Sequence, residues 1–301
     1  MSGFHVTCKS SQQFTIPAAI DYNREKRTMD RGKGLSMKIR STVIIKGAGD
    51  LASGVAHRLW MSGFKLLMLE LPEPLVVRRT VAFASAVYDG EALLEGVKAR
   101  ICSEYDQLDK YWDEGVIPLF VDPLGTMIGR VCPHVLVDAV MAKRNTGTSC
   151  NDAPVVIGLG PGFFAGRDVH AVIETRRGHD LGKAIYSGSA EADTGIPGEI
   201  CGFSAQRLLR APAIGKITPL VKIGELVRQG QTVADVDGKP VIAQISGVVR
   251  GMIYPGLAVK KGTKIGDIDP RGENVDCHTV SDKARAVAGG VLEAILRLGY
   301  S

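Results

Sequence analysis

The chain has 301 residues, of which 45% are hydrophobic and 23% are charged, and its formal net charge is +5. This length suits two domains, and this composition suits a folded globular protein. Residues 1–40 hold eight basic and three acidic side chains, so they carry the whole excess of +5 and the rest of the chain is neutral. A neutral folded part has no excess charge for binding a phosphate backbone, so we predict no nucleic-acid partner.

The six cysteines are scattered, and none has a partner at the spacing of a metal site. We therefore predict reduced thiols, no bound metal and a cytoplasmic location. No stretch reaches the apolar length of a membrane span, so no membrane partner is predicted. Residues 1–36 are polar and lack the apolar core of a secretory signal, and we predict that they form a disordered extension.

From residue 43 onward, short apolar runs alternate with stretches of helical periodicity. Residues 43–45 and 66–69 suit buried strands, and residues 51–61 between them suit a helix. The pattern continues with strands at 97–102, 116–121, 135–137, 154–159 and 171–174, and with helices at 76–87 and 105–114. Strands that alternate with helices predict an α/β fold, a Rossmann-like and mostly parallel sheet over residues 37–205.

The pattern changes in residues 211–270, which are rich in Gly and Pro and lack helical periodicity. A repeat with a period of 32 residues aligns Gly215 with Gly247 and Val233 with Ile265. Two such halves predict an inserted all-β module over residues 206–272. It resembles the barrel-sandwich hybrid of lipoyl and biotinyl domains.

Lys239 lies between the two halves, near the place where such carriers hold their modified lysine. Its neighbours Asp237, Gly238 and Pro240 suit a tight turn and do not match the carrier motif. We therefore expect no covalent lipoyl or biotin group and interpret the module as a scaffold.

The last segment, residues 281–298, has an apolar stripe at helical spacing, with Ser281 suited to cap its start. Such an apolar helix needs a partner larger than the β module. We predict that residues 273–301 end in a helix that docks on the α/β domain.

A glycine-rich turn follows the first strand and opens the first helix. Gly47, Gly49 and Ala52 fit the pattern G-x-G-x-x-(G/A), whose helix N-terminus offers free amides to a phosphate. Glu70, which ends the second strand, suits a carboxylate that accepts a hydrogen bond from a ribose hydroxyl. Asp50 is an acid where phosphate would lie, and the alternative is that it caps the helix. The cofactor site predicted here comprises Gly47, Gly49, Asp50, Ala52, Ser53 and Glu70, and the alternative is a tight turn without a ligand.

Two later loops also follow strands, at the edge of the sheet where open α/β proteins place their ligands. The first contains Gly160, Gly162 and Arg167, and the second contains Arg176 and His179. Flexible turns and basic side chains could hold an anion, and His179 could exchange a proton near neutral pH. We add these five residues to the predicted cofactor site. The alternatives are that the first loop is only a structural connector and that His179 is an exposed histidine without a function. No catalytic residue stands out.

Six motifs recur in order along residues 37–301 and resemble those of one family, the YqeB-type accessory proteins of selenium-dependent molybdenum hydroxylase systems. The motifs are IKGAGDLASG (45–54), GLGPGF (158–163), ETRRGHDLG (174–182), TGIPGE (194–199), DIDPR (267–271) and SDKARA (281–286). Residues 1–36 fall outside this resemblance. The resemblance implies a role in molybdenum hydroxylase maturation, with a hydroxylase or its maturation proteins as partners, and it transfers no catalytic residue.

The leading hypothesis is an accessory factor that binds a nucleotide at the Gly47 turn, either NAD-like or a molybdopterin dinucleotide. A second hypothesis is an NAD(P)-dependent oxidoreductase, in which Glu70 would favour NAD because its charge repels a 2′-phosphate. A third is a non-catalytic interaction protein whose glycine turns are structural. Whether a reaction is catalysed, and whether the chain forms a homo-oligomer, stay open.

Overall fold

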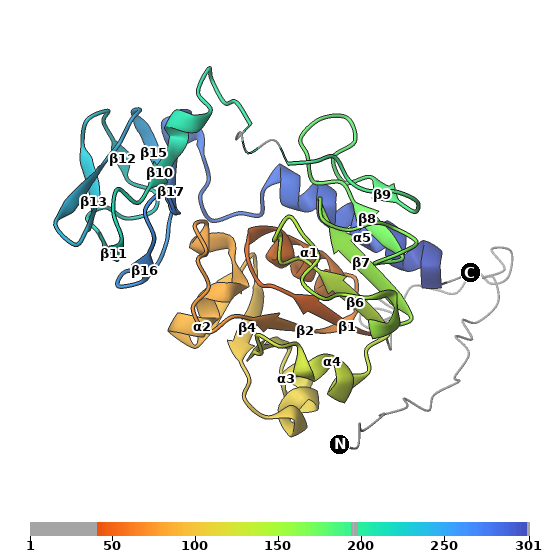
Figure 1. Cartoon of the computed structure of the whole chain (residues 1–301). Coiled ribbons are helices and arrows are strands. Elements are labelled where there is room, and N and C mark those ends of the chain that lie inside the picture. Colours follow the sequence, from red (N-terminus) through yellow and green to blue (C-terminus); the bar gives the residue numbers. More distant parts are fainter. Residues whose placement is uncertain (1–40, 194, 196–197, 300–301) are drawn as a thin grey trace, which may run out of the picture.

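The computed structural model describes residues 41–193, 195 and 198–299. In this part of the chain a nine-stranded sheet carries helices on both faces, and a separate unit of two four-stranded sheets lies beside it (Figure 1). The predicted extension, residues 1–36, lies outside the described residues.

The nine-stranded sheet has the order β3-β4-β5-β2-β1-β6-β7-β8-β9. Its seven inner strands are parallel, in spatial order β4 (Val97–Ile101), β5 (Val116–Val121), β2 (Lys65–Glu70), β1 (Thr42–Lys46), β6 (Val135–Asp138), β7 (Val155–Leu159) and β8 (Ala171–Ile173). The edge strands β3 (Glu91–Leu94) and β9 (Ala184–Ile185) are antiparallel to their neighbours. Apart from β4, which holds Lys98 and Arg100, the inner strands are apolar at all but their end residues, because both faces of the sheet are covered.

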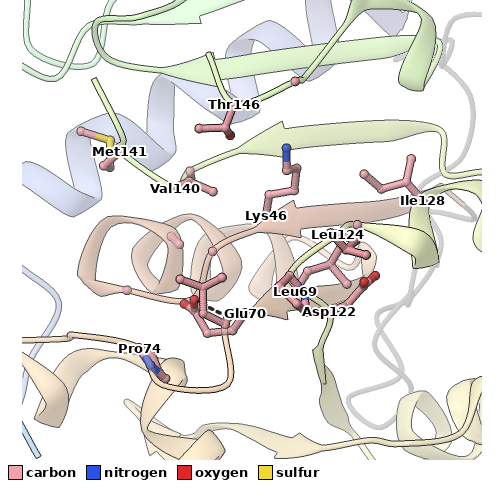
Figure 2. Close-up of a pocket in the computed structure, with 18 of the residues that line it drawn as sticks. Lys46, Leu69, Glu70, Pro74, Asp122, Leu124, Ile128, Val140, Met141 and Thr146 are labelled. Atoms are coloured by element: carbon pink, nitrogen blue, oxygen red, sulfur yellow. Dashed lines mark hydrogen bonds between the residues drawn. The ribbon is translucent and has the colours of Figure 1, made fainter. Parts of the chain in front are cut away.

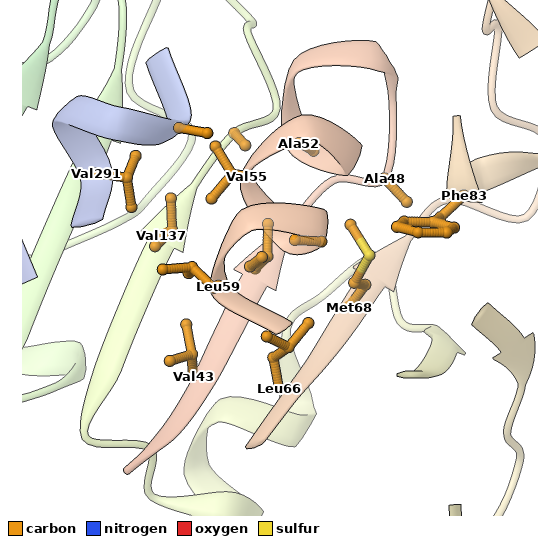
Figure 3. Close-up of a cluster of buried hydrophobic side chains, with 14 of the residues drawn as sticks. Val43, Ala48, Ala52, Val55, Leu59, Leu66, Met68, Phe83, Val137 and Val291 are labelled. Atoms are coloured by element: carbon orange, nitrogen blue, oxygen red, sulfur yellow. The ribbon is translucent and has the colours of Figure 1, made fainter. Parts of the chain in front are cut away.

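Alternate residues of β1 face the two opposite layers of the core. Ile45 packs with α1 (Asp50–Met61) and α5 (Asp282–Gly299), in the cluster that Figure 3 shows around Val55 and Leu59. Ile44 packs on the other side, with α3 (Leu108–Asp113) and α4 (Thr126–Val131). Both clusters are buried, so the central strand is held by apolar packing on two sides.

Helix α5 returns from the end of the chain to pack against α1. The two helices approach closely at Gly54, where an added Cβ would lie 2.7 Å from the Cβ of Ala284. Small residues at the contact permit this distance. The buried stripe of α5, including Val287 and Val291, covers the sheet face that α1 leaves open.

The separate β unit consists of two antiparallel four-stranded sheets around one apolar cluster. One sheet holds β10 (Leu208–Arg210), β17 (Lys264–Asp269), β15 (Gly247–Met252) and β12 (Leu226–Val227). The other holds β14 (Lys239–Ile242), β13 (Thr232–Val236), β11 (Gly215–Pro219) and β16 (Ala258–Val259). The 32-residue repeat maps β11, β12 and β13 onto β15, β16 and β17.

The helix predicted over residues 76–87 is wrong for most of its length. These residues form the 3₁₀ turns η1 (Arg79–Val81) and η2 (Phe83–Ser85) and begin the short helix α2 (Ala86–Asp89). The amide of Phe83 donates to the Ser53 hydroxyl at 2.8 Å, and the amide of Ala84 donates to the Ala48 carbonyl at 2.8 Å. Bonds to the glycine-rich turn therefore replace the bonds of a regular helix.

The predicted fold class, a Rossmann-like sheet with a barrel-sandwich hybrid module, is also wrong. The sheet is mixed, and between residues 139 and 170, all of them described, its connections hold only the 3₁₀ turn η4 (Cys150–Asp152) and no helix. The β unit forms two separate four-stranded sheets and not the predicted barrel-sandwich hybrid module. The physical reason is that periodicity identifies single strands, whereas hydrogen bonds between distant segments decide which strands pair at an edge.

Candidate functional site

A cleft of about 1870 Å³ opens at the carboxyl ends of β1, β2 and β5 (Figure 2). From β1 the chain crosses through α1 to β2 on one side, while β6 pairs with β1 on the other side. Open α/β sheets bind ligands at such a switch point, outside the carboxyl ends of the strands. The cleft is therefore the first candidate for a binding site.

The Gly47 turn forms one wall of the cleft, and its backbone amides are its main chemical feature. Gly47 has φ +90°, and an added Cβ would lie 3.1 Å from the carbonyl oxygen of Ala139, so a larger residue is strained there. Gly49 is the N-cap residue of α1 and has no side-chain capping bond, and nothing lies within 4 Å of the position of its Cβ. The first turn of α1 therefore lines the cleft without a side-chain cap, and an uncapped helix N-terminus is a position that suits an anion.

Asp50 pairs with Arg78 and does not cap the helix. The Arg78 Nη1 donates to Asp50 Oδ2 at 2.8 Å, and the Arg78 side chain is only 10% exposed. This pair neutralises the one carboxylate in the first turn of α1, so the helix end keeps its positive potential. Asp50 Oδ1 and Arg78 Nε are both buried without a hydrogen-bond partner.

Two other predicted residues, Ala52 and Ser53, have different surroundings. Ala52 lines the cleft. Ser53 is fully buried, and its hydroxyl donates to the Ala48 carbonyl at 2.9 Å while it accepts from the Phe83 amide. Ser53 thus holds the turn in shape and is not available to a ligand, which corrects its assignment as a ligand contact.

Glu70 lines the cleft and supports the Gly47 turn from the adjacent strand. Its Oε2 accepts from the Ala48 amide and its Oε1 accepts from the Leu71 amide, both at 2.7 Å. Burial raises the pKa of Glu70, although these two amides act to lower it. Each carboxylate oxygen has a second lone pair, so Glu70 can still accept from a ligand hydroxyl.

Sequence reasoning missed a polar triad of Lys46, Asp138 and Thr148 beside the turn. The Lys46 Nζ lies 3.1 Å from Asp138 Oδ2 and donates to Thr148 Oγ1 at 2.7 Å, while the Thr148 hydroxyl donates to Asp138 Oδ2 at 2.5 Å. Asp138 and Thr148 are buried, and Lys46 lines the cleft. Their position in the sequence could have indicated the pair, because Lys46 and Asp138 are the last residues of adjacent parallel strands.

The rim of the cleft is apolar and solvent-exposed. The exposed fractions of Leu71, Leu75, Leu124 and Val140 are 49%, 50%, 86% and 43%, and all four line the cleft. Exposed apolar side chains around a polar floor are typical of a site for an organic ligand.

The loop after β7 packs against protein and does not line the cleft. A Cβ at Gly160 would lie 2.6 Å from Thr175 Oγ1, and one at Gly162 would lie 2.6 Å from the Arg144 amide nitrogen. Arg167 is exposed and pairs with the adjacent Asp168 at 3.0 Å. Gly160 and Gly162 therefore allow the loop to pack closely, and Arg167 lies on its surface. The geometry of these three residues does not support the prediction that they hold the cofactor.

The loop after β8 is also separate from the cleft. Arg176 is exposed and pairs with Glu191, and His179 is exposed. Neither lines the cleft, so the structure does not bring them to the Gly47 turn. The neighbouring Arg177 makes two hydrogen bonds to Asp282, at 2.6 and 3.0 Å, and its guanidinium lowers the pKa of that carboxyl.

Within the described residues, no group of three or more His, Cys, Asp or Glu side chains could hold a metal ion. The described helices include none that is long and apolar enough to cross a membrane.

The fold and cleft define an α/β protein with a cleft at the switch point of its sheet. By sequence, the chain is 48% identical to "Uncharacterized protein YqeB" of Escherichia coli (strain K12), over 98% of this chain and 55% of that protein. This match confirms the resemblance to YqeB-type proteins, and the chain spans about half the length of that curated relative. Because 98% of the chain is matched, the match also extends into residues 1–36, which the motif resemblance left out. No family model matches the chain.

Solved structures give only a distant likeness. A succinylglutamate desuccinylase/aspartoacylase from Rhodobacter sphaeroides matches at 15% identity and a TM-score of 0.24, over 76% of this chain and 85% of that one. An aspartoacylase family protein from Mesorhizobium loti matches at 13% identity and a TM-score of 0.26, over the same shares. Scores this low carry no argument about chemistry.

Proposed function

We propose that the cleft binds a nucleotide or dinucleotide-type cofactor, with its phosphate at the N-terminus of α1. The carrying observation is the open space at Gly49, next to a first helical turn that has no side-chain cap. The apolar rim at Leu71, Leu75 and Leu124 would cover the base of the nucleotide, and Glu70 would accept from its ribose.

The biological role that we propose is maturation of a selenium-dependent molybdenum hydroxylase. Its support is the relation to YqeB together with the motif resemblance. The cofactor would then be NAD-like or a molybdopterin dinucleotide, and the partner would be the hydroxylase or another of its maturation proteins.

The test is calorimetric titration of the protein with NAD, ATP, CTP and a molybdopterin dinucleotide. Gly49→Val adds a side chain to open space at an ordinary φ of −69°, so the fold should be kept while the phosphate is excluded. We expect an affinity loss of at least about tenfold, since displaced charge-assisted hydrogen bonds are worth about 1.5–3 kcal/mol.

Gly289→Val is the matched control, because Gly289 on α5 also has nothing within 4 Å of its Cβ position and does not line the cleft. Absence of binding by all four ligands would reject the proposal. Equal affinities of the Gly49→Val variant and the unmodified protein would reject the phosphate position.

A further inference from the structure

The β unit touches the α/β unit next to the Gly47 turn. Gly251 of β15 packs directly on Val77, where an added Cβ would lie 2.7 Å from the Val77 carbonyl oxygen. Val77 lines the cleft, and so does Lys264 of β17. Thus one edge of the cleft is formed by the β unit.

Two largely buried guanidinium groups lie at this contact, near enough that burial and then the charge of Arg78 lower the pKa of Arg250, and neither group is fully satisfied. Arg78 precedes η1, and Arg250 precedes Gly251 on the strand that packs on Val77. The side chains are 10% and 13% exposed, and the Nε of each is buried without a partner. A buried donor without a partner costs about 1–3 kcal/mol, so such a group indicates a missing acceptor.

The carboxylates near Arg250 are already engaged by other arginines. Asp267 and Asp269 lie 3.8 and 3.9 Å from the Arg250 Nη1, beyond hydrogen-bond distance. Asp267 accepts from Arg207 at 3.3 Å, and Asp269 accepts from Arg271 at 2.8 Å. Arg250 is therefore only weakly compensated by these two carboxylates.

The charges at the contact do not balance. The ion pairs around Arg78 and Arg250, together with Lys264 and the neighbouring Arg177–Asp282 pair, hold six cations and four carboxylates, a net charge of +2; they are Arg78, Arg177, Arg207, Arg250, Lys264 and Arg271 against Asp50, Asp267, Asp269 and Asp282. A local cationic excess of this kind suits a ligand that carries two negative charges.

We infer that Arg250 and Lys264 of the β unit, together with Arg78 and the N-terminus of α1, bind the diphosphate of the ligand. This inference rests on the proposed function and narrows it, because a diphosphate distinguishes a nucleoside diphosphate or dinucleotide from a monophosphate. The β unit is then half of the binding site.

The experiment measures the affinity of the full chain for inorganic pyrophosphate, ADP, AMP and adenosine by calorimetry. We expect pyrophosphate and ADP to bind more tightly than AMP, and adenosine to bind weakest. Arg250→Gln and Lys264→Gln should each lower the affinity for pyrophosphate and for ADP at least about tenfold, because each variant loses one charge-assisted hydrogen bond. The matched control is Arg228→Gln, which changes an exposed arginine in the same unit. Its affinities should stay within about twofold of those of the unmodified protein.

The outcomes separate the inference from the proposed function. If ADP binds and neither variant weakens it, the inference fails and nucleotide binding stands. If pyrophosphate binds through Arg250 and Lys264 but ADP, NAD, ATP and CTP do not bind, nucleotide binding fails and the anion site stands. If no phosphate compound binds, both fail.

Should Arg250→Gln lower the melting temperature sharply, the affinity of Lys264→Gln decides the test, because Lys264 is exposed and its loss does not leave a buried carboxylate unpaired.

Discussion

At the scale of single residues, buried carboxylates organise the loops of this protein. Glu70 binds the backbone of the Gly47 turn, and Glu174 does the same in the loop after β8, where it accepts from the amides of Thr175, Arg176 and Glu191. Asp138 holds Lys46 at the cleft. Acidic side chains at strand ends thus fix the conformation of the adjacent backbone, and this conformation gives the ligand site its shape.

Asp269 gives a pH-dependence that can be measured at the same scale. Its burial alone would raise the pKa, but the hydrogen bonds from the Arg271 side chain and amide outweigh this, and the pKa lies below its ordinary value of 3.8. A lowered pKa means that the stabilisation is present above pH 3.8 and is lost as the pH falls through the folded-state pKa. Asp269→Asn should therefore reduce the free energy of unfolding by about 2 kcal/mol at pH 7 and by less at pH 3.

Urea unfolding at the two pH values checks this, with Asp276→Asn at an exposed position as the control. A difference between Asp269→Asn and the unmodified protein that is the same at both pH values would contradict the assigned cause.

At the scale of elements, the position of α5 depends on glycines that allow close backbone approach. A Cβ at Gly290 would overlap the carbonyl oxygen of Gly182, whereas a Cβ at the adjacent Gly289 meets nothing within 4 Å. Gly290→Ala should lower the free energy of unfolding by about 1–3 kcal/mol through overpacking. Gly289→Ala should raise it by up to about 1 kcal/mol, because alanine has the higher helix propensity.

Thermal unfolding of the two variants tests the packing directly, since the same methyl group is added at neighbouring positions. If both variants shift the melting temperature in the same direction, α5 does not pack on Gly182 as described.

At the scale of the whole molecule, the contact between Gly251 and Val77 couples the β unit to the cleft. Gly251→Ala places a methyl group against a backbone carbonyl and should push the two units apart, with a loss of about 1–3 kcal/mol in stability. Because Arg250 and Lys264 would move with the β unit, pyrophosphate affinity should fall as well. Calorimetry and thermal unfolding measure both effects against Gly289→Ala, and unchanged pyrophosphate affinity in a destabilised variant would show that the units are not coupled at the site.

Local pattern alone was enough to predict the β1–α1–β2 segment and the glycine-rich turn. A strand, a G-x-G-x-x-(G/A) turn and a helix are formed by residues that are neighbours in sequence, so their signals are local. The 32-residue repeat was equally visible, because each half uses the same glycines at its turns. The relation to YqeB followed from motifs read in the same way.

Only the tertiary structure decided how the strand edges pair, which side chains line the cleft and which loops are excluded from it. Gly160 and Gly162 have the composition of a ligand loop, yet the backbone near Arg144 and the side chain of Thr175 occupy the space beside them. Lys46 and Asp138 become partners because β1 and β6 are adjacent, although 92 positions separate them in the chain. Arg250 lies near Arg78 because Gly251 packs on Val77. Sequence determines local conformation through neighbouring residues, whereas a binding site is assembled from distant segments whose contact depends on the complete fold.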